Sequence, residues 1–171
     1  EQARALAERL REAGVEVLSR APALGFFDGL VPVWQGDTLH QIRASAHVAA
    51  TGAVQQPLIF PNNDLPGVML AGGARRLAAL YAVKPGERAV VSCVSDAGLD
   101  AAVALHAAGV PVQAVADLRP EAAERPAAAQ LADAGVQLLA GHTVVRASGR
   151  GAVSSVVVAR IDGDGLVSGA P

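Results

Sequence analysis

Ala89-Val90-Val91-Ser92-Cys93-Val94-Ser95-Asp96-Ala97-Gly98 is the stretch of this chain that decides its fold. It begins as an apolar strand and ends as a turn of small residues, after which a helix is expected from about Leu99 to Ala108. A second apolar run, Val112 to Ala116, follows and ends at Asp117. A strand, a turn, a helix and a second strand make a βαβ unit, which predicts an α/β protein with a parallel sheet covered by helices.

The turn between strand and helix carries an altered glycine fingerprint. If Gly98 is the third glycine of G-x-G-x-x-G, Cys93 and Ser95 hold the first two positions. Small residues still permit a tight turn, and the helix amino terminus offers unpaired N–H groups to a pyrophosphate. We therefore predict dinucleotide contacts from the residues of this turn, namely Cys93, Val94, Ser95, Asp96 and Gly98.

Asp117 lies 19 residues after Gly98, close to the spacing of the acidic residue that accepts hydrogen bonds from the adenosine ribose. A carboxylate there repels a 2′-phosphate, so we predict that NAD is preferred over NADP. Arg119 is the competing feature, because an arginine so close in sequence can receive the 2′-phosphate instead. A solvent-exposed loop acid is the alternative interpretation of Asp117.

One helix-to-strand joint occurs three times along the chain. Ala13-Gly14-Val15, Ala108-Gly109-Val110 and Ala134-Gly135-Val136 each follow an alanine-rich amphipathic segment and open an apolar run. This pattern predicts a helix that ends at a glycine with left-handed backbone and continues into a buried strand. Repeated joints of this kind favour parallel βα units.

Two antiparallel meanders follow the first and third joints. In the first half the expected strands are Val15 to Leu18, Ala23 to Asp28, Leu30 to Trp34, Thr38 to Ala44 and His47 to Thr51; in the second they are Val136 to Leu139, Thr143 to Ala147 and Val153 to Ile161. The shared ββα arrangement predicts two related nucleotide-binding domains. Aligning Val15 with Val136 places Ala23 opposite Val144, so both become candidates for contact with an adenine ring, although both could equally be core residues.

The two halves are joined by Ala50-Thr51-Gly52-Ala53 and a proline-punctuated crossing from Pro57 to Gly67, after which Gly67 to Tyr81 is expected to be helical. Small side chains at a strand end let the backbone approach a bulky phosphate-linked cofactor. Thr51, Gly52 and Ala53 are therefore candidates for contact with a flavin nucleotide. A plain strand-to-turn junction is the alternative.

Composition and charge narrow the function classes. The chain has 171 residues, 51% of them hydrophobic, a net charge of -2 and scattered arginines, which gives no electrostatic footprint for nucleic acid. Its single cysteine, Cys93, excludes an internal disulfide framework, and we expect it to be a buried small side chain rather than a nucleophile. No catalytic residues are predicted, because no cluster of acid, base and carboxylate-binding arginine is typical of a substrate site. No metal site is predicted, because the histidines show no ligand spacing: His40, His47, His106 and His142.

No apolar run is long enough for a membrane span, and no cationic leader precedes an apolar segment, so a cytoplasmic protein without membrane contact is expected. The chain starts at Glu1 without methionine, which suggests an excerpt of a larger protein.

A family resemblance extends over nearly the whole chain. It is carried by Gln41-Ile42-Arg43-Ala44, Ala50-Thr51-Gly52-Ala53, Gln56-Pro57-Leu58-Ile59-Phe60, Asn63-Asp64, Pro66-Gly67-Val68-Met69-Leu70-Ala71, Arg88-Ala89-Val90-Val91, Asp96 and Asp117. These segments resemble the middle of the α subunit of heterotetrameric sarcosine oxidase. The same group includes α subunits of opine oxidase, hydrogen cyanide synthase and dye-linked amino-acid dehydrogenases.

The resemblance implies FAD/NAD(P)-binding ββα (Rossmann-like) domains of the pyridine nucleotide-disulfide oxidoreductase type. It implies a tightly bound NAD in this subunit, FAD in a partner β-type subunit that oxidises the amine, and FMN at the interface. Residues 1–56 are then part of a first, FAD-type domain, 57–67 the crossing segment and 68–171 an NAD-type domain incomplete at its C-terminal end.

The expected function is the cofactor-binding portion of a flavin-dependent oxidoreductase subunit that acts on amines or amino acids with a partner subunit in a hetero-oligomer. The chain lacks the amino-terminal G-x-G-x-x-G of the family and any match to its tetrahydrofolate-binding domain, so on its own it is expected to be inactive. The alternative is a non-catalytic scaffold or assembly module whose dinucleotide site has degenerated.

Overall fold

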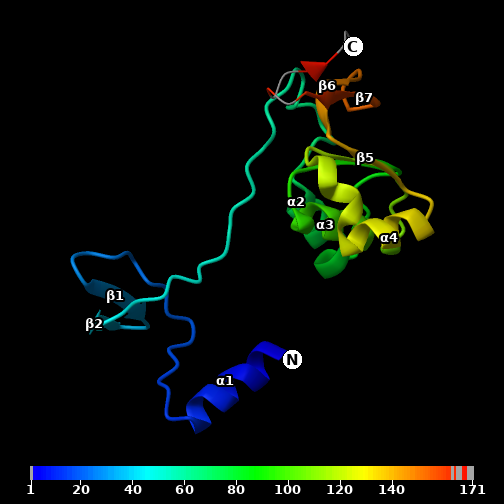
Figure 1. Cartoon of the computed structure of the whole chain (residues 1–171). Coiled ribbons are helices and arrows are strands. Elements are labelled where there is room, and N and C mark those ends of the chain that lie inside the picture. Colours follow the sequence, from blue (N-terminus) through cyan, green and yellow to red (C-terminus); the bar gives the residue numbers. More distant parts are fainter. Residues whose placement is uncertain (1, 163, 165–166, 169–171) are drawn as a thin grey trace. The chain divides into compact units, whose positions relative to one another are not determined.

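The computed structural model describes residues 2–162, 164 and 167–168, and the chain divides into two compact units, 1–52 and 53–171. The first unit contains helix α1 (Gln2–Glu12) and strands β1 (Leu30–Gln35) and β2 (Thr38–Arg43) (Figure 1). β1 and β2 form an antiparallel hairpin that turns at Gly36, whose φ of 58° suits a glycine. This hairpin agrees with the two strands expected at Leu30 to Trp34 and Thr38 to Ala44.

The other strands expected in the first unit are not formed. Residues Val15 to Leu18 and His47 to Thr51 have no regular structure, and the stretch from Ala23 to Asp28 makes only isolated bridges, Ala23 to Val33 and Phe27 to Leu30. A strand forms only when a neighbour accepts and donates a continuous series of its backbone hydrogen bonds. The Ala23–Asp28 segment makes such bonds to β1 only at separate points, and no strand of the described residues pairs with the other two segments. The sequence pattern predicted the hairpin correctly, but the buried strand expected after the first joint, Val15 to Leu18, is not formed.

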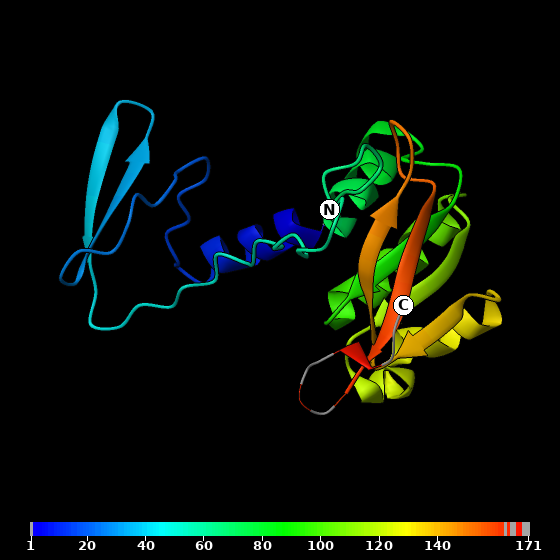
Figure 2. The ribbon, with the colours of Figure 1, turned by 90° about the horizontal axis from the view of Figure 1, so that it is seen from above.

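The second unit is built on a parallel sheet. Its strands β3 (Ala89–Cys93), β4 (Val112–Asp117) and β5 (Gln137–Ala140) lie in the order β3-β4-β5, and both neighbouring pairs are parallel. Helices α2 (Ala71–Tyr81), α3 (Asp96–Ala107) and α4 (Pro126–Asp133) and the short 3-10 helix η1 (Pro120–Glu124) connect and cover the strands (Figures 1 and 2). The predicted α/β class is confirmed.

The core of the second unit lies between the sheet and its helices. Leu99 of α3, Val115 of β4 and Leu131 of α4 are fully buried, and alanines such as Ala102 fill the remaining helix face. Small side chains on α3 let its backbone come close to the strands, which positions the start of that helix directly against the end of β3. The helix begins at Asp96, earlier than the Leu99 expected from the apolar pattern.

An antiparallel meander completes the second unit. Strands β6 (His142–Ser148), β7 (Ser155–Ile161) and β8 (Val167–Ser168) pair in that order, and β6 and β7 lie side by side in Figure 2. The expected combination of a parallel sheet with an antiparallel meander, typical of FAD/NAD(P)-binding ββα domains, is therefore confirmed in this half.

The crossing segment is bound to this meander. The Ala147 N–H donates to the carbonyl of Pro61 at 3.1 Å, Asn62 Nδ2 donates to the carbonyl of Ala147 at 2.9 Å, and the Val153 N–H donates to the carbonyl of Pro66 at 2.9 Å. Gly67 follows with a φ of 98°, a conformation outside the helical region. Because residues 61–67 form turns that these contacts fix to the meander, α2 starts at Ala71 rather than at the predicted Gly67.

The three helix-to-strand joints share one hydrogen-bond pattern. Gly14, Gly109 and Gly135 have φ of 77°, 83° and 72°, and each donates its N–H to the carbonyl three residues earlier. The following valine donates to the leucine carbonyl five residues earlier, so each helix ends in a Schellman motif. The predicted left-handed glycines are confirmed at all three joints, although only the second and third lead into strands.

Candidate functional site

The turn from β3 to α3 presents a helix amino terminus beside a strand end. Ser95 takes the cap position with extended backbone and no side-chain cap bond, while its carbonyl accepts from the N–H groups of Gly98 and Leu99 at 3.0 and 3.4 Å. The first N–H groups of a helix have no partner inside the helix. This turn therefore has the donors needed to bind an anionic group such as a pyrophosphate.

Gly98 is required in this turn by space rather than by backbone angle. A Cβ at position 98 would overlap the Cβ of Cys93 and lie 3.0 Å from its Sγ. The residue is buried, so neither the helix nor the strand can shift freely. Close packing of helix on strand is the role of the third glycine in the dinucleotide fingerprint, and Gly98 occupies the corresponding place.

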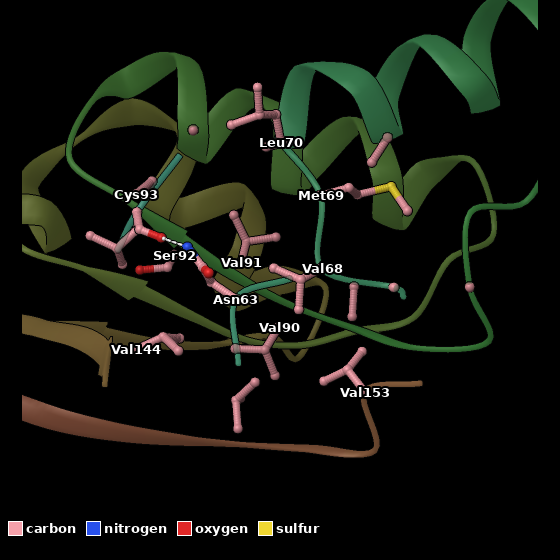
Figure 3. A pocket seen from close by; sticks show the side chains of 18 of the residues that line it. Asn63, Val68, Met69, Leu70, Val90, Val91, Ser92, Cys93, Val144 and Val153 are labelled. Atoms are coloured by element: carbon pink, nitrogen blue, oxygen red, sulfur yellow. Dashed lines mark hydrogen bonds between the residues drawn. The ribbon is translucent and has the colours of Figure 1, made fainter. Parts of the chain in front are cut away.

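A cavity of about 810 Å³ opens beside this turn, entirely within the second unit. Figure 3 shows that its walls come from the segment before α2, from β3 and from the meander. Five of the residues predicted from sequence line it together: Cys93, Val94, Ser95, Gly98 and Val144. Val144, which the sequence suggested only through the alignment of the two halves, is buried in the wall formed by β6.

Asp117 is not among the cavity-lining residues. It is fully buried, and its carboxylate accepts from the Arg119 N–H at 2.9 Å, from Arg119 Nε at 3.0 Å and from Arg119 Nη2 at 2.8 Å. Cys93 Sγ donates to Oδ2 of the same carboxylate at 3.4 Å. A ribose hydroxyl can therefore reach Asp117 only when the Arg119 side chain moves.

Asp96 stands at the first residue of α3 and binds the other side of the same guanidinium. Arg119 Nη1 donates to its Oδ1 at 2.7 Å. The Asp96 side chain is 56% exposed, whereas that of Arg119 is 18% exposed. Arg119 is thus fixed between a buried carboxylate and an exposed one.

The electrostatics of this cluster set its protonation states. Burial of the Asp117 carboxyl acts to raise its pKa, but the hydrogen bonds from the side chain and backbone of Arg119 outweigh burial, so the pKa lies below its ordinary value. Burial, followed by the charge of Asp117, raises the pKa of Cys93 to about 12. The hydrogen bonds to Asp117 and then to Asp96 raise the pKa of Arg119. Near neutral pH the thiol is protonated and Asp117 is charged, which fits a structural cysteine better than a nucleophile.

The remaining candidates lie outside regular structure or in the hairpin region. Thr51, Gly52 and Ala53 are exposed and form no helix or strand, and Gly52 has a φ of 79°. Ala23 is exposed and bridges to Val33. Ala23, Thr51 and Gly52 belong to the first unit and Ala53 does not line the cavity, so the structure does not group these four with the residues of the β3–α3 turn.

Two parts of the cavity wall were not predicted from the sequence. One part is formed by Asn63, Val68, Met69 and Leu70, which lie before α2 and are labelled in Figure 3. The segment from Asn63 to Ala71 was used for the family resemblance, but it was not predicted to line a cavity. The second is Gln55, whose Oε1 accepts the N–H of Gly72 at 2.8 Å near the start of α2, a contact between residues 17 apart that no local pattern reveals.

Within the residues that the structure describes, no group of three or more His, Cys, Asp or Glu side chains is placed to hold a metal ion. None of the helices in the same described ranges has the length and apolar character of a membrane span.

Comparison with known proteins identifies relatives, although no protein-family model matches the chain. It is 38% identical over 130 residues to the sarcosine oxidase subunit alpha of Corynebacterium sp. (strain P-1), covering 75% of this chain and 13% of that protein. It is 37% identical over 139 residues to the sarcosine oxidase subunit alpha of Rhizobium meliloti (strain 1021), covering 70% of this chain and 14% of that protein. The chain thus spans only a small part of the length of these relatives.

Among solved structures, a NAD-dependent persulfide reductase from A. fulgidus matches with a TM-score of 0.56 at 20% sequence identity. The match covers 94% of this chain and 31% of the reductase, and at this identity it supports the fold. The sequence comparisons confirm the resemblance predicted from the motifs: this chain is related to the α subunits of sarcosine oxidase.

Proposed function

We propose that the chain is the cofactor-binding portion of a flavin-dependent oxidoreductase subunit of the sarcosine oxidase α type, and that it holds NAD. The observation that carries the proposal is the contact of Gly98 with Cys93, because it draws the start of α3 tightly against the end of β3. A helix start held this way directs its free N–H groups at one place outside the sheet. The relationship to sarcosine oxidase α subunits supports the same assignment.

In this proposal the residues around the β3–α3 turn contact different parts of the dinucleotide. The backbone of Val94, Ser95 and Asp96 faces the pyrophosphate, Gly98 and Cys93 provide the close approach, and Val144 borders the adenine. Asp117, at the end of β4, lies on the ribose side. NAD, when bound, can exchange a hydride with a redox partner; the protein supplies binding and orientation.

The domain assignment belongs to the same proposal. Residues 1–56 form part of an FAD-type domain, with Ala23, Thr51, Gly52 and Ala53 on the flavin side, residues 57–67 form the crossing, and residues 68–171 form the NAD-type domain. The division of the chain near residue 52 supports two parts. The proposal further includes a cytoplasmic hetero-oligomer that holds FAD and FMN elsewhere. In this assembly a β-type partner subunit oxidises an amine or amino acid.

A scaffold with a degenerate nucleotide site is the second candidate function. One observation favours it: the buried Asp117 carboxylate is already occupied by Arg119 and Cys93. If these bonds persist in solution with nucleotide present, the ribose loses its acceptor and the site binds weakly. The two functions differ in whether the protein retains a dinucleotide.

The test uses the full-length protein that contains this chain. Denaturation followed by mass spectrometry of the released small molecules should yield NAD in about equal amount to the protein. Release of no dinucleotide, together with no binding of added NAD, would favour the scaffold.

A pair of variants locates the site. Ser95→Asp should preserve folding, because aspartate is a preferred helix cap, but its charge should repel the pyrophosphate and weaken NAD binding by about tenfold or more. Gln130→Glu adds the same charge at an exposed position of α4 outside the cavity and should leave the affinity unchanged. Equal affinities in both variants would contradict a pyrophosphate position at the start of α3.

A further inference from the structure

A network of charged side chains surrounds the end of β4 and the start of α3. Arg119 donates to Asp117 through Nε and Nη2 and to Asp96 through Nη1. A guanidinium has five N–H donors, so three of them are directed at carboxylates. The Arg119 side chain is 18% exposed, which leaves only a small part of it accessible to a ligand.

A second arginine lies next to the same exposed carboxylate. Arg125 Nε is 3.8 Å from Asp96 Oδ1, and Arg125 Nη2 is 3.8 Å from Glu121 Oε1. The Nε atom is buried and has no hydrogen-bond partner among the described residues. Three carboxylates, on Asp96, Asp117 and Glu121, thus face two guanidinium groups, and the cluster carries one net negative charge.

The position of this cluster decides what it can affect. In a βαβ dinucleotide site, the adenosine ribose lies outside the carboxyl end of the second strand, and a 2′-phosphate is received by an arginine near that end. Arg119 follows β4 by two residues and is in the place for such a contact. It is already bound on two sides, and a phosphate brought to it would meet the Asp96 carboxylate within a cluster that carries one net negative charge.

We propose that Asp96 determines dinucleotide selectivity, because its charge repels a 2′-phosphate and its bond to Nη1 keeps Arg119 from receiving one, so that the site takes NAD and rejects NADP. This inference rests on the proposed function. The preference for NAD over NADP was predicted from Asp117 at the end of β4. This inference adds Asp96, at the start of α3, as a second residue that discriminates between the two nucleotides. Removing the charge of Asp96 frees one donor of Arg119, takes from Arg125 one of its two neighbouring carboxylates and makes the cluster neutral.

The experiment measures the dissociation constants of NAD and NADP for the full-length protein by isothermal titration calorimetry. The wild type should bind NAD more tightly. Asp96→Asn should shift the ratio of the two constants toward NADP by about tenfold, since one charge is removed beside a dianionic phosphate. The shift should shrink as salt is raised, because screening weakens contacts between exposed charges.

Two further variants make the result specific. Asp100→Asn removes an equal charge from an exposed position one turn later on α3 and should leave the ratio unchanged. Asp96→Ser, which has a different side chain and the same loss of charge, should reproduce the shift. Far-UV circular dichroism verifies folding, which the exposure of the Asp96 side chain favours.

The outcomes separate this inference from the function on which it rests. Binding of neither nucleotide to the wild type would overturn both. Tight NAD binding with an unchanged ratio in both Asp96 variants, an equal shift in Asp100→Asn, or a preference of the wild type for NADP would overturn the role of Asp96 and leave the proposed dinucleotide site intact.

Discussion

Cys93 and Asp117 face each other at the ends of neighbouring strands, where the parallel register pairs them directly. The thiol donates to a carboxylate that Arg119 keeps charged. Burial of the thiol, and then the negative charge of Asp117 beside it, raise the pKa of Cys93 from 9.0 to about 12. Cys93 therefore packs against Gly98 and donates a hydrogen bond to Asp117, a bond that was not predicted from the sequence, and the residue is partly rather than fully buried.

We predict that the Cys93 thiol of the folded chain titrates near pH 12, as followed by thiolate absorbance near 240 nm. In the unfolded chain it should titrate near its ordinary value. Since the folded pKa is the higher one, the folded state resists ionisation, and stability should fall as the pH rises from about 9 to 12. Cys93 is the only cysteine, and the tyrosinate absorbance of the single tyrosine, Tyr81, is removed by subtracting the titration of the Cys93→Ser variant.

Asp117→Asn is the control for this titration. It removes the charge next to the thiol but leaves the burial, so the pKa of Cys93 should decrease while remaining above its ordinary value. A folded wild type whose thiol titrates near pH 9 would contradict the buried thiol–carboxylate pair.

The turn from β3 to α3 is the element on which the proposed site depends, and two glycines test it. Gly98→Ala should destabilise the chain by roughly 1–3 kcal/mol, because the added methyl overlaps Cβ of Cys93 in a buried place. Gly73→Ala lies in α2 with open space around the new methyl and should stabilise by about 0.5–1 kcal/mol through helix propensity. Urea denaturation followed by far-UV circular dichroism measures both changes.

A compensating substitution makes the steric origin testable. Cys93→Gly removes the Cβ that Gly98→Ala would strike, so the double variant should be more stable than the sum of the two single changes predicts. Additive effects would show that the cost of Gly98→Ala arises elsewhere in the helix.

At the scale of the whole molecule, the cavity lacks the groups that amine oxidation needs. Its lining, which comes from the described part of the chain, contains no Asp, Glu or His. Flavin-dependent oxidation also requires the isoalloxazine ring to be held beside the substrate in a dry, shaped pocket. The related α subunits are about seven times longer than the matched segment. In the proposed function, the oxidation takes place outside residues 1–171.

We predict that the chain alone, with or without added FAD and NAD, does not oxidise sarcosine, proline, opines or glycine. A dye-reduction assay with each substrate measures this, with the dye and buffer alone as the reference. Substrate-dependent reduction above that reference would place the chemistry within these residues and contradict the assignment.

Part of the candidate site could be predicted because its residues are close in sequence. The turn from Cys93 to Gly98 forms one wall, and the comparison of the two meanders identified Val144 in another. The pairing of Arg119 with Asp96 was not predicted, because these residues are 23 positions apart and meet only when β4 lies beside β3. Sequence spacing predicted that Asp117 binds a ribose, which stays a prediction; its hydrogen bonds to the Arg119 side chain were not predicted.

The three joints separate what the sequence determined from what the tertiary structure decided. Leu10 and Val15, Leu105 and Val110, and Leu131 and Val136 make the same capping bond around a left-handed glycine. The latter two pairs are buried, but Leu10 and Val15 are 39% and 46% exposed. The cap forms from sequence alone because its donors and acceptors lie within six residues. Burial and strand pairing need neighbours from distant positions, which the β3-β4-β5 sheet supplies to the second and third joints and the described part of the first unit does not supply to the first.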